Sequence, residues 1–374
     1  MTSWIGTPQN DSGVWCPASP KVNHLEKQLN YPFNDQLPLI GEPIEIAPGK
    51  LWVRMPLPFA LDHINLWLLR DQHEGRDGWT LVDTGVGLPA TREAWETIFS
   101  KHLGGKPIVR VICTHCHPDH FGNADWIGER YGSRVWMSQG DFMQGRLLFS
   151  GQLGADGLST MRHFMANGLN DEQCIAELSS RKMHFIATVP SVPQSFHRIV
   201  DGDTIEIGGE TWRVITGYGH SPEHLALYNA KAHLLISGDM LLPRISTNIA
   251  VHAVEPESNP LQQFMDSIQR FLLLPPETMV LPSHGRPFTR LHVRVQQYLD
   301  HHLERLAEVS ELCASAPATA AHVVPIMFKR KLDTHQMVFA LGEALAHLHK
   351  LWYTGELVRE RDAAGVFHFR PSKN

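Results

Sequence analysis

The sequence has few of the features that mark membrane, disulfide-stabilised and nucleic-acid-binding proteins. No window reaches the roughly 18 consecutive apolar residues of a membrane span. Five cysteines are too few for a disulfide framework in 374 residues, so we expect a reducing, cytoplasmic location. The net charge of -6 argues against a general nucleic-acid-binding surface. The N-terminal segment lacks a basic start and an apolar run, so we expect no secretory signal there.

The length of the chain predicts one main domain and an appendage, because 374 residues can bury one large core and a smaller one. Residues 1–46, rich in proline and polar residues, are expected to form an N-terminal arm. Residues 47–290 are expected to form the catalytic domain, with a helical insertion at about 139–196. The remaining residues, 291–374, form a separate C-terminal segment in this prediction.

The catalytic domain alternates strand-like and helix-like segments. Residues 79–85 (WTLVDTG) and 107–114 (PIVRVICT) are apolar strands bounded by turn residues, and the helical pattern of residues 90–103 lies between them. A second helix is expected to begin at Pro118, directly after the second of these strands. Strand–helix–strand units of this kind indicate an α/β fold.

The C-terminal segment reads as three helices and a hairpin. Helical patterns cover residues 293–313, 322–330 and 334–352, and two strands are expected at 357–361 and 366–370. This order is typical of a winged-helix module. Its only basic cluster is Lys329, Arg330 and Lys331, so we expect contact with a second copy or closure of a pocket, with nucleic-acid binding as the weaker alternative. We expect deletion of this segment to disturb assembly or substrate range more than metal binding.

Polar residues that suit metal binding gather directly after predicted strands. They are His115, His117, Asp119 and His120 after one strand, and His220, Asp239 and His284 after three others. Sheet strands deliver their carboxyl ends to a common edge, so these side chains can converge. Imidazole nitrogens and carboxylate oxygens suit zinc, iron or manganese. The pattern therefore predicts a metal site.

The residues that carry this pattern resemble the signature of the metallo-β-lactamase superfamily. The segment THCHPDH (114–120) is similar to H-x-H-x-D-H. LVDTG (81–85) precedes it, and GYGHSPEH (217–224), SGD (237–239) and LPSHG (281–285) follow it, in the order expected of the family. The resemblance implies an αββα sandwich with two metal ions at one edge. It assigns His115, His117 and His220 to the first ion, Asp119, His120 and His284 to the second, Asp239 as the bridge, and Asp83 to orienting a ligand.

Some residues depart from that pattern or stand outside it. Tyr218 replaces the proline that often precedes the third histidine, and Glu223 stands where the family often has glycine. Tyr218, together with Phe59 in the loop between the first two predicted strands, is a candidate for the substrate pocket. Cys113 and Cys116 have the C-x-x-C spacing of redox sites, but Cys113 ends an apolar strand, so we discount a redox role.

Two divalent ions about 3.5–4 Å apart can share a water and lower its pKa from about 15.7 toward neutrality. The expected function is therefore hydrolysis by a metal-bridging hydroxide, with Asp119 as the catalytic residue that orients it and moves its proton. Zinc is the expected metal, with iron or manganese as alternatives. An ester, thioester or lactone of a small acyl compound is the expected substrate, and a homo-oligomer through the C-terminal segment or the arm is the expected assembly.

Two alternatives use the same signature. The first is a phosphodiesterase or endoribonuclease with the C-terminal module on RNA. The second is a persulfide dioxygenase with one iron. The metal site does not distinguish them, because substrate choice depends on the pocket.

Overall fold

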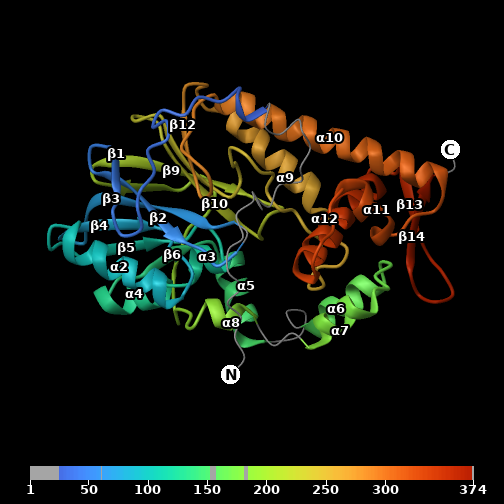
Figure 1. Ribbon diagram of the computed structural model, residues 1–374. Coiled ribbons are helices and arrows are strands. Elements are labelled where there is room, and N and C mark those ends of the chain that lie inside the picture. The colour runs from blue at the N-terminus through green and yellow to red at the C-terminus, as the bar shows by residue number, and fades with distance from the viewer. Residues whose placement is uncertain (1–24, 60, 152–156, 181–183, 373–374) are drawn as a thin grey trace.

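Two β-sheets and the helices on their outer faces make up most of this computed structural model (Figure 1). It describes residues 25–59, 61–151, 157–180 and 184–372. Most of the predicted N-terminal arm, residues 1–24, and two short parts of the predicted insertion lie outside the described residues. No helix in the described ranges is long and apolar enough to cross a membrane.

The first sheet has seven strands in the order of the sequence. These are β1 (Ile44–Ala47), β2 (Lys50–Pro56), β3 (His63–His73), β4 (Arg76–Val82), β5 (Ile108–Ile112), β6 (Val135–Met137) and β7 (His197–Arg198). β1 to β4 pair antiparallel, and β4 to β7 pair parallel. All five residues of β5 are buried, as expected for a central parallel strand with both faces covered. β1 begins within the range predicted as an arm, so this end of the arm is part of the sheet.

The second sheet has five strands and packs against the first. Its order is β12 (Met279–Pro282), β11 (Leu234–Gly238), β10 (His224–Asn229), β9 (Glu210–Gly217) and β8 (Thr204–Ile207). β11 and β12 are parallel, and the other pairs are antiparallel. Large apolar side chains of both sheets, among them Trp52, Trp67 and Trp212, form the core between them. Burial of these faces is the main contribution to holding the layers together.

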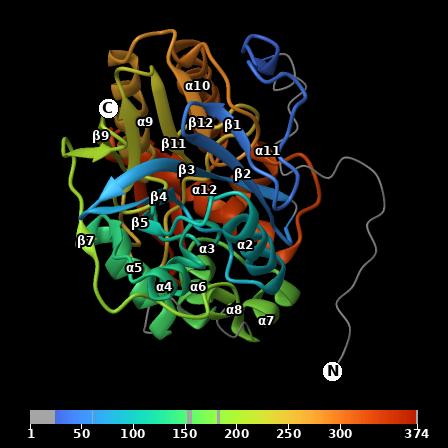
Figure 2. The same ribbon diagram turned by 90° about the vertical axis from the view of Figure 1, so that its left-hand side faces the viewer.

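Helices cover both outer faces, which completes the αββα sandwich (Figure 2). α2 (Pro89–Lys101), α3 (Pro118–Phe121), α4 (Ala124–Tyr131) and α5 (Gln139–Ser150) pack on the first sheet. α9 (Pro260–Gln269), the short 3₁₀ helix η1 (Arg270–Leu273) and α10 (Leu291–Ser315) cover the second. The predicted insertion is mainly helical where described: α5 is followed by α6 (Gly157–Met165), α7 (Glu172–Ser180) and α8 (His184–Thr188).

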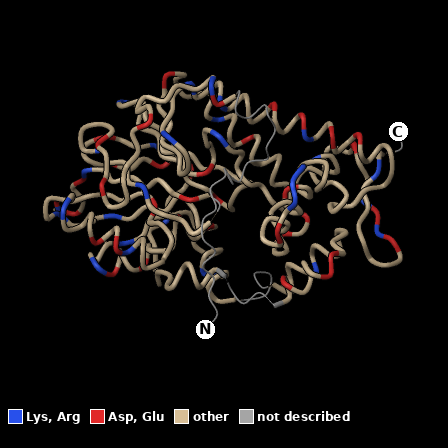
Figure 3. The backbone as a smooth tube through the Cα atoms, in the orientation of Figure 1, with Lys and Arg blue, Asp and Glu red and all other residues tan. Residues whose placement is uncertain are grey.

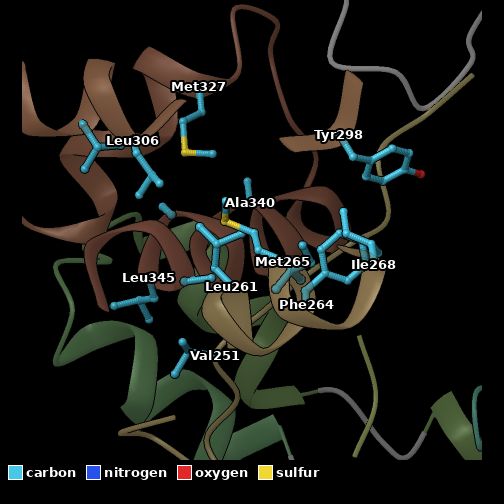
Figure 4. Close-up of a cluster of buried hydrophobic side chains, with 14 of the residues drawn as sticks. Val251, Leu261, Phe264, Met265, Ile268, Tyr298, Leu306, Met327, Ala340 and Leu345 are labelled. Carbon is cyan, nitrogen blue, oxygen red and sulfur yellow. The ribbon is translucent and has the colours of Figure 1, made fainter. Parts of the chain in front are cut away.

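The C-terminal segment contains the predicted helices and hairpin. After α10 come α11 (Ala320–Met327), α12 (Thr334–Tyr353), β13 (Leu357–Arg361) and β14 (Phe367–Pro371). α12 begins at a capping box, in which Asp333 and Gln336 each accept from the other's backbone N–H. The buried face of α12 joins one cluster with α9 and α10, and Figure 4 shows Leu345, Leu261 and Leu306 in it. The segment therefore shares its core with the second sheet layer.

Candidate metal centre

The predicted ligands meet where five strand ends reach one edge of the sandwich. β4 leads to Asp83, and β5 leads to the segment 115–120. In the second sheet, β9 leads to His220, β11 to Asp239 and β12 to His284. In the first sheet, β4 and β5 are parallel, so their carboxyl ends lie at the same edge. In the second sheet, β11 and β12 are parallel, and β9 runs in the same direction because β10 is antiparallel to both β9 and β11.

The seven predicted ligands form two neighbouring groups. The first is His115, His117, His220 and Asp239, and the second is Asp119, His120 and His284. The potential ligand atoms within each group lie within 4.8 Å of one another. Asp239 faces both groups. Its Oδ2 lies 3.3 Å from Nε2 of His220, and its Oδ1 lies 3.4 Å from Nε2 of His120 and 3.5 Å from Nε2 of His284.

Hydrogen bonds on the outer side of the rings fix which nitrogen faces the centre. Nδ1 of His220 donates to the backbone oxygen of Asn248, and Nδ1 of His284 donates to that of His63, both at 2.8 Å. A carbonyl oxygen can only accept, so in the neutral rings Nε2 carries a lone pair directed inward. This outer hydrogen bond is the arrangement that orients histidine ligands in metal sites.

Among the seven candidate ligands, two buried atoms lack a hydrogen-bond partner in the described residues. They are Nε2 of His120 and Oδ1 of Asp239. Buried polar atoms without partners are costly, and lone pairs that face carboxylate oxygens repel one another unless positive charge lies between them. The donor set and its orientation therefore fit divalent cations.

The pKa values at the centre follow from burial and neighbouring charge. Burial lowers the pKa of His115 well below its usual value and that of His117 to about 3, so both rings are neutral, as ligands must be. Burial also acts to lower the pKa of His284, but the charges of Asp239 and Asp119 outweigh it and raise that pKa to about 10. A cation bound at His284 would therefore displace a proton.

Asp83 holds His120 and the start of the ligand loop. Its Oδ2 lies 2.8 Å from Nδ1 of His120. Its two oxygens also accept from the backbone N–H of Thr114 at 2.7 Å and from the hydroxyl of Thr114 at 2.9 Å. Asp83 has a left-handed backbone, with φ of 62°, which is uncommon for a residue other than glycine and turns the chain at the end of β4.

His224 is a residue of the centre that the sequence analysis missed. Its ring is buried, its centroid lies 4.8 Å from that of His115, and its Nε2 accepts from the backbone N–H of Asp239 at 3.1 Å. A Cβ on Gly238 would lie 2.3 Å from this ring, and Gly238 has φ of 54°, so glycine is required there. The place of His224 in the same short run as His220 was the available signal.

Asp141, which the analysis also missed, ties two ligand loops together. The buried carboxylate accepts from the backbone N–H of Cys116 at 2.9 Å and of Glu223 at 2.8 Å, and from the hydroxyl of Ser221 at 3.1 Å. Glu223 in turn accepts from the backbone N–H of Gly140 at 2.7 Å, which links β10 to the start of α5. The departure at Glu223 therefore anchors the first turn of α5.

The remaining predicted site residues lie at the surface or in the core. Tyr218 and Phe59 are 40% and 38% exposed, so both side chains are open to solvent near the strand ends. Their contact with substrate stays a prediction. Cys113 and Cys116 are buried free thiols, and burial raises both pKa values well above the usual value. This disfavours the reactive thiolate and agrees with the decision to discount a redox role.

Comparison with known proteins gives matches over both parts of the chain. A model of the metallo-beta-lactamase superfamily matches residues 60–284, and a model of the metallo-beta-lactamase-like C-terminal domain matches residues 306–372. A probable metallo-hydrolase of Bacillus subtilis, YqjP, is 26% identical over 80% of this chain and 91% of its own length. A hydroxyacylglutathione hydrolase of Erythrobacter litoralis is 29% identical over 72% of this chain and 85% of its own length.

Two crystal structures are similar over most of the chain. A beta-lactamase domain protein from Burkholderia ambifaria is 51% identical, with a TM-score of 0.89. The match covers 94% of this chain and 100% of the Burkholderia chain. A metallo-beta-lactamase family protein from Thermus thermophilus is 28% identical, covers 87% of this chain over 100% of its own length, and has a TM-score of 0.72.

Proposed function

The chain belongs to the metallo-beta-lactamase superfamily and is a hydrolase, and on this basis we propose that it cleaves the thioester or ester bond of a small acyl compound. We propose two divalent cations, zinc first, as its cofactors. The observation that carries the proposal is the position of Asp239, whose two oxygens face the two groups of candidate ligands. A carboxylate so placed can serve both cations at once.

Two bound cations would lower the pKa of a shared water and polarise the carbonyl oxygen of the substrate. The residues of the protein would position the attacking water and accept its proton. Asp119 is the proposed catalytic residue, and its Oδ2 lies 3.4 Å from Nε2 of His284. In the cation-free centre the charge of His120 lowers the pKa of Asp119 although burial acts to raise it, and bound cations would act in the same direction as that charge. An ionised carboxylate at this position can hold the attacking water and accept its proton.

A thioester is the favoured bond for two reasons. Several relatives, including those of Erythrobacter litoralis and Rhodobacter capsulatus, are named hydroxyacylglutathione hydrolases. A thiol has a pKa of about 8.5, so the thiolate leaves near neutral pH without a separate proton donor.

The second ligand group, Asp119, His120 and His284, is complete, which favours two cations over the single iron of a dioxygenase.

The proposed partner is a small molecule. Acidic and basic residues are interspersed along the described part of the C-terminal helices and hairpin (Figure 3), which disfavours RNA as the partner. We retain a homo-oligomer through the C-terminal segment or the arm as a proposal. The cytoplasm is the proposed location, because Cys113, Cys116 and Cys313 are buried free thiols.

The test is a substrate panel on protein loaded separately with zinc, iron or manganese. The panel contains acyl thioesters, aryl esters, lactones, a bis-aryl phosphodiester, a short RNA and a β-lactam, and metal content is measured on the same samples. We expect about two ions per chain and the highest kcat/KM on a thioester or ester. Preferential cleavage of the phosphodiester or RNA would overturn the proposal. So would a single iron per chain with oxygen uptake on a persulfide.

A further inference from the structure

A pocket of about 620 Å³ adjoins the candidate metal centre. Its wall includes His284, a candidate ligand, so the pocket lies next to the second ligand group. Residues of β2, the β2–β3 loop, the loops at 243–245 and 284–286 and the segment 26–37 also line it. The volume lies in the range of about 300–1,000 Å³ that is typical of small-molecule sites.

Three arginines line this pocket, and two of them are neutralised. Arg244 pairs with Glu26 at 3.1 Å. Arg286 pairs with Asp35 at 2.9 Å, and its guanidinium stacks on the ring of Tyr31 at 4.2 Å. Both guanidinium groups therefore serve to hold the segment around residues 26–35 against the loops beside the metal centre.

Arg54, the third, has no such partner. It lies on β2 opposite Asn65 of β3 and is half-buried in the pocket wall. Within the described ranges, no side chain or carbonyl makes an ion pair or hydrogen bond with its guanidinium. Burial lowers its pKa, which reflects the loss of water around the charge, and Asp62 opposes this only from a distance.

Asp62 is itself engaged elsewhere. Its carboxylate is 81% exposed and accepts from Nδ1 of His63 at 2.6 Å. Nε2 of His63 accepts a hydrogen bond from the backbone N–H of Gly285. The hydrogen of the neutral ring is therefore on Nδ1. Asp62 thus serves the loop that carries His284, and no described residue occupies the five donors of Arg54. A guanidinium that has lost water without gaining a partner favours an oxyanion, which it can bind through two parallel hydrogen bonds.

We propose that Arg54 binds a carboxylate or phosphate group of the substrate in this pocket, while the scissile bond lies at the metal centre. The substrate class is then an acyl thioester or ester that carries an acidic group. This inference rests on the proposed function for the position of the reacting bond, but the anion site itself can be tested separately.

The first test uses matched pairs of substrates that differ by one anionic group. Glutaryl and pentanoyl thioesters of N-acetylcysteamine form the carboxylate pair, and acetyl thioesters of phosphopantetheine and pantetheine form the phosphate pair. We expect at least one anionic substrate to be preferred in kcat/KM by about 10- to 100-fold, and the pair that shows the preference identifies the anion. Equal kcat/KM within both pairs would overturn the inference.

The second test uses variants. Arg54→Gln should remove the preference by lowering kcat/KM for the anionic member and changing the neutral member by less than about threefold, and Arg54→Lys should restore part of it. Arg198→Gln, on β7 and exposed, is the matched control and should keep the full preference. An equal loss on both members of the pair in Arg54→Gln would show a structural role and overturn the inference.

The third test separates the anion site from the chemistry. Glutarate and inorganic phosphate are titrated by calorimetry into metal-loaded wild type and Arg54→Gln at equal metal content. Binding that weakens about 10-fold or more in the variant supports the anion site even if no thioester is hydrolysed, in which case the proposed function alone fails. Equal binding in both proteins overturns the anion site and leaves thioester hydrolysis intact.

Discussion

Single residues at the centre divide into those that face the two ligand groups and those that hold them in place. Asp239 belongs to the first kind, since its oxygens face both groups. Asp141, His224 and Asp83 belong to the second, since they contact loops or rings that carry the candidate ligands. The two kinds should respond differently to substitution.

Asp239→Ala should abolish hydrolysis and lower the metal content to about one ion per chain or less, because the carboxylate that serves both groups is gone. Elemental analysis and activity on the best thioester of the panel measure this. Asp266→Ala, at an exposed position on α9, is the control. A fully active Asp239→Ala protein would contradict the bridging role.

Asp141→Asn should weaken metal binding about 10- to 100-fold while the protein stays folded. The amide presents one donor where the carboxylate had only acceptors, so the N–H groups of Cys116 and Glu223 cannot both keep their partner. Competition against a chelator measures the affinity. Asp266→Asn is the control, and unchanged affinity in Asp141→Asn would show that the two loops are held by other contacts.

Glu343 on α12 makes stability depend on pH. Burial raises its pKa to about 8, against the opposing charge of Arg305. The folded protein therefore keeps a proton that the unfolded chain releases above about pH 4.5, so the stabilisation from this group is complete below that pH and is lost as pH rises to about 8. Each unit of pKa shift corresponds to about 1.4 kcal/mol.

Glu343→Gln should remove this loss. We expect the unfolding free energy of the variant, relative to wild type, to increase from pH 5 to pH 8 by up to a few kcal/mol. Denaturant unfolding of both proteins at the two pH values measures the difference. A difference that does not change with pH would show that Glu343 titrates normally in the folded protein.

At the scale of elements, α12 is held by its apolar face. Leu345 is fully buried in the cluster that α12 shares with α9 and α10, whereas Leu303 on α10 is 55% exposed. Leu345→Ala should lower the unfolding free energy by about 2–5 kcal/mol, and Leu303→Ala should change it by less than about 0.5 kcal/mol. Denaturant unfolding checks both. Equal effects of the two substitutions would mean that α12 is not packed as described.

The elements that the sequence predicted well are those with a periodic apolar pattern over many residues or with a clear capping motif. The pattern over residues 334–352 corresponds to α12, and the two strands after it correspond to β13 and β14. The strands β1 and β7 were not predicted. They are short and lie at the two edges of the first sheet, so their strand conformation depends on pairing with β2 and β6 and less on their own pattern.

At the scale of the whole molecule, the C-terminal segment supports the metal centre. Arg294 on α10 donates to the backbone oxygens of Leu242 and Ile245 at 2.6 and 2.9 Å, and the hydroxyl of Tyr298 donates to that of Ile245 at 2.9 Å. The loop that follows Asp239 is thus held by α10. The sequence-based expectation that deleting this segment would disturb assembly or substrate range more than metal binding does not take these contacts into account.

A chain ended at residue 290 should therefore lose both fold and metal. The truncation removes the side chains of α10 and α12 from a shared core and leaves apolar residues of α9 in water. We expect insoluble or largely unfolded protein, measured by circular dichroism and metal content against the full chain. A folded truncated protein with about two ions would show that α10 is dispensable for the centre.

The types of the candidate ligands, their order and their positions at strand ends can all be read from local patterns, because each ligand directly follows an apolar strand. The contacts that hold and surround these ligands depend on tertiary packing. Asp141 accepts a hydrogen bond from Ser221, which lies 80 residues later in the sequence. Arg54 and His284 line the same pocket. Such contacts depend on how the two sheets and the C-terminal helices pack, which no local pattern records.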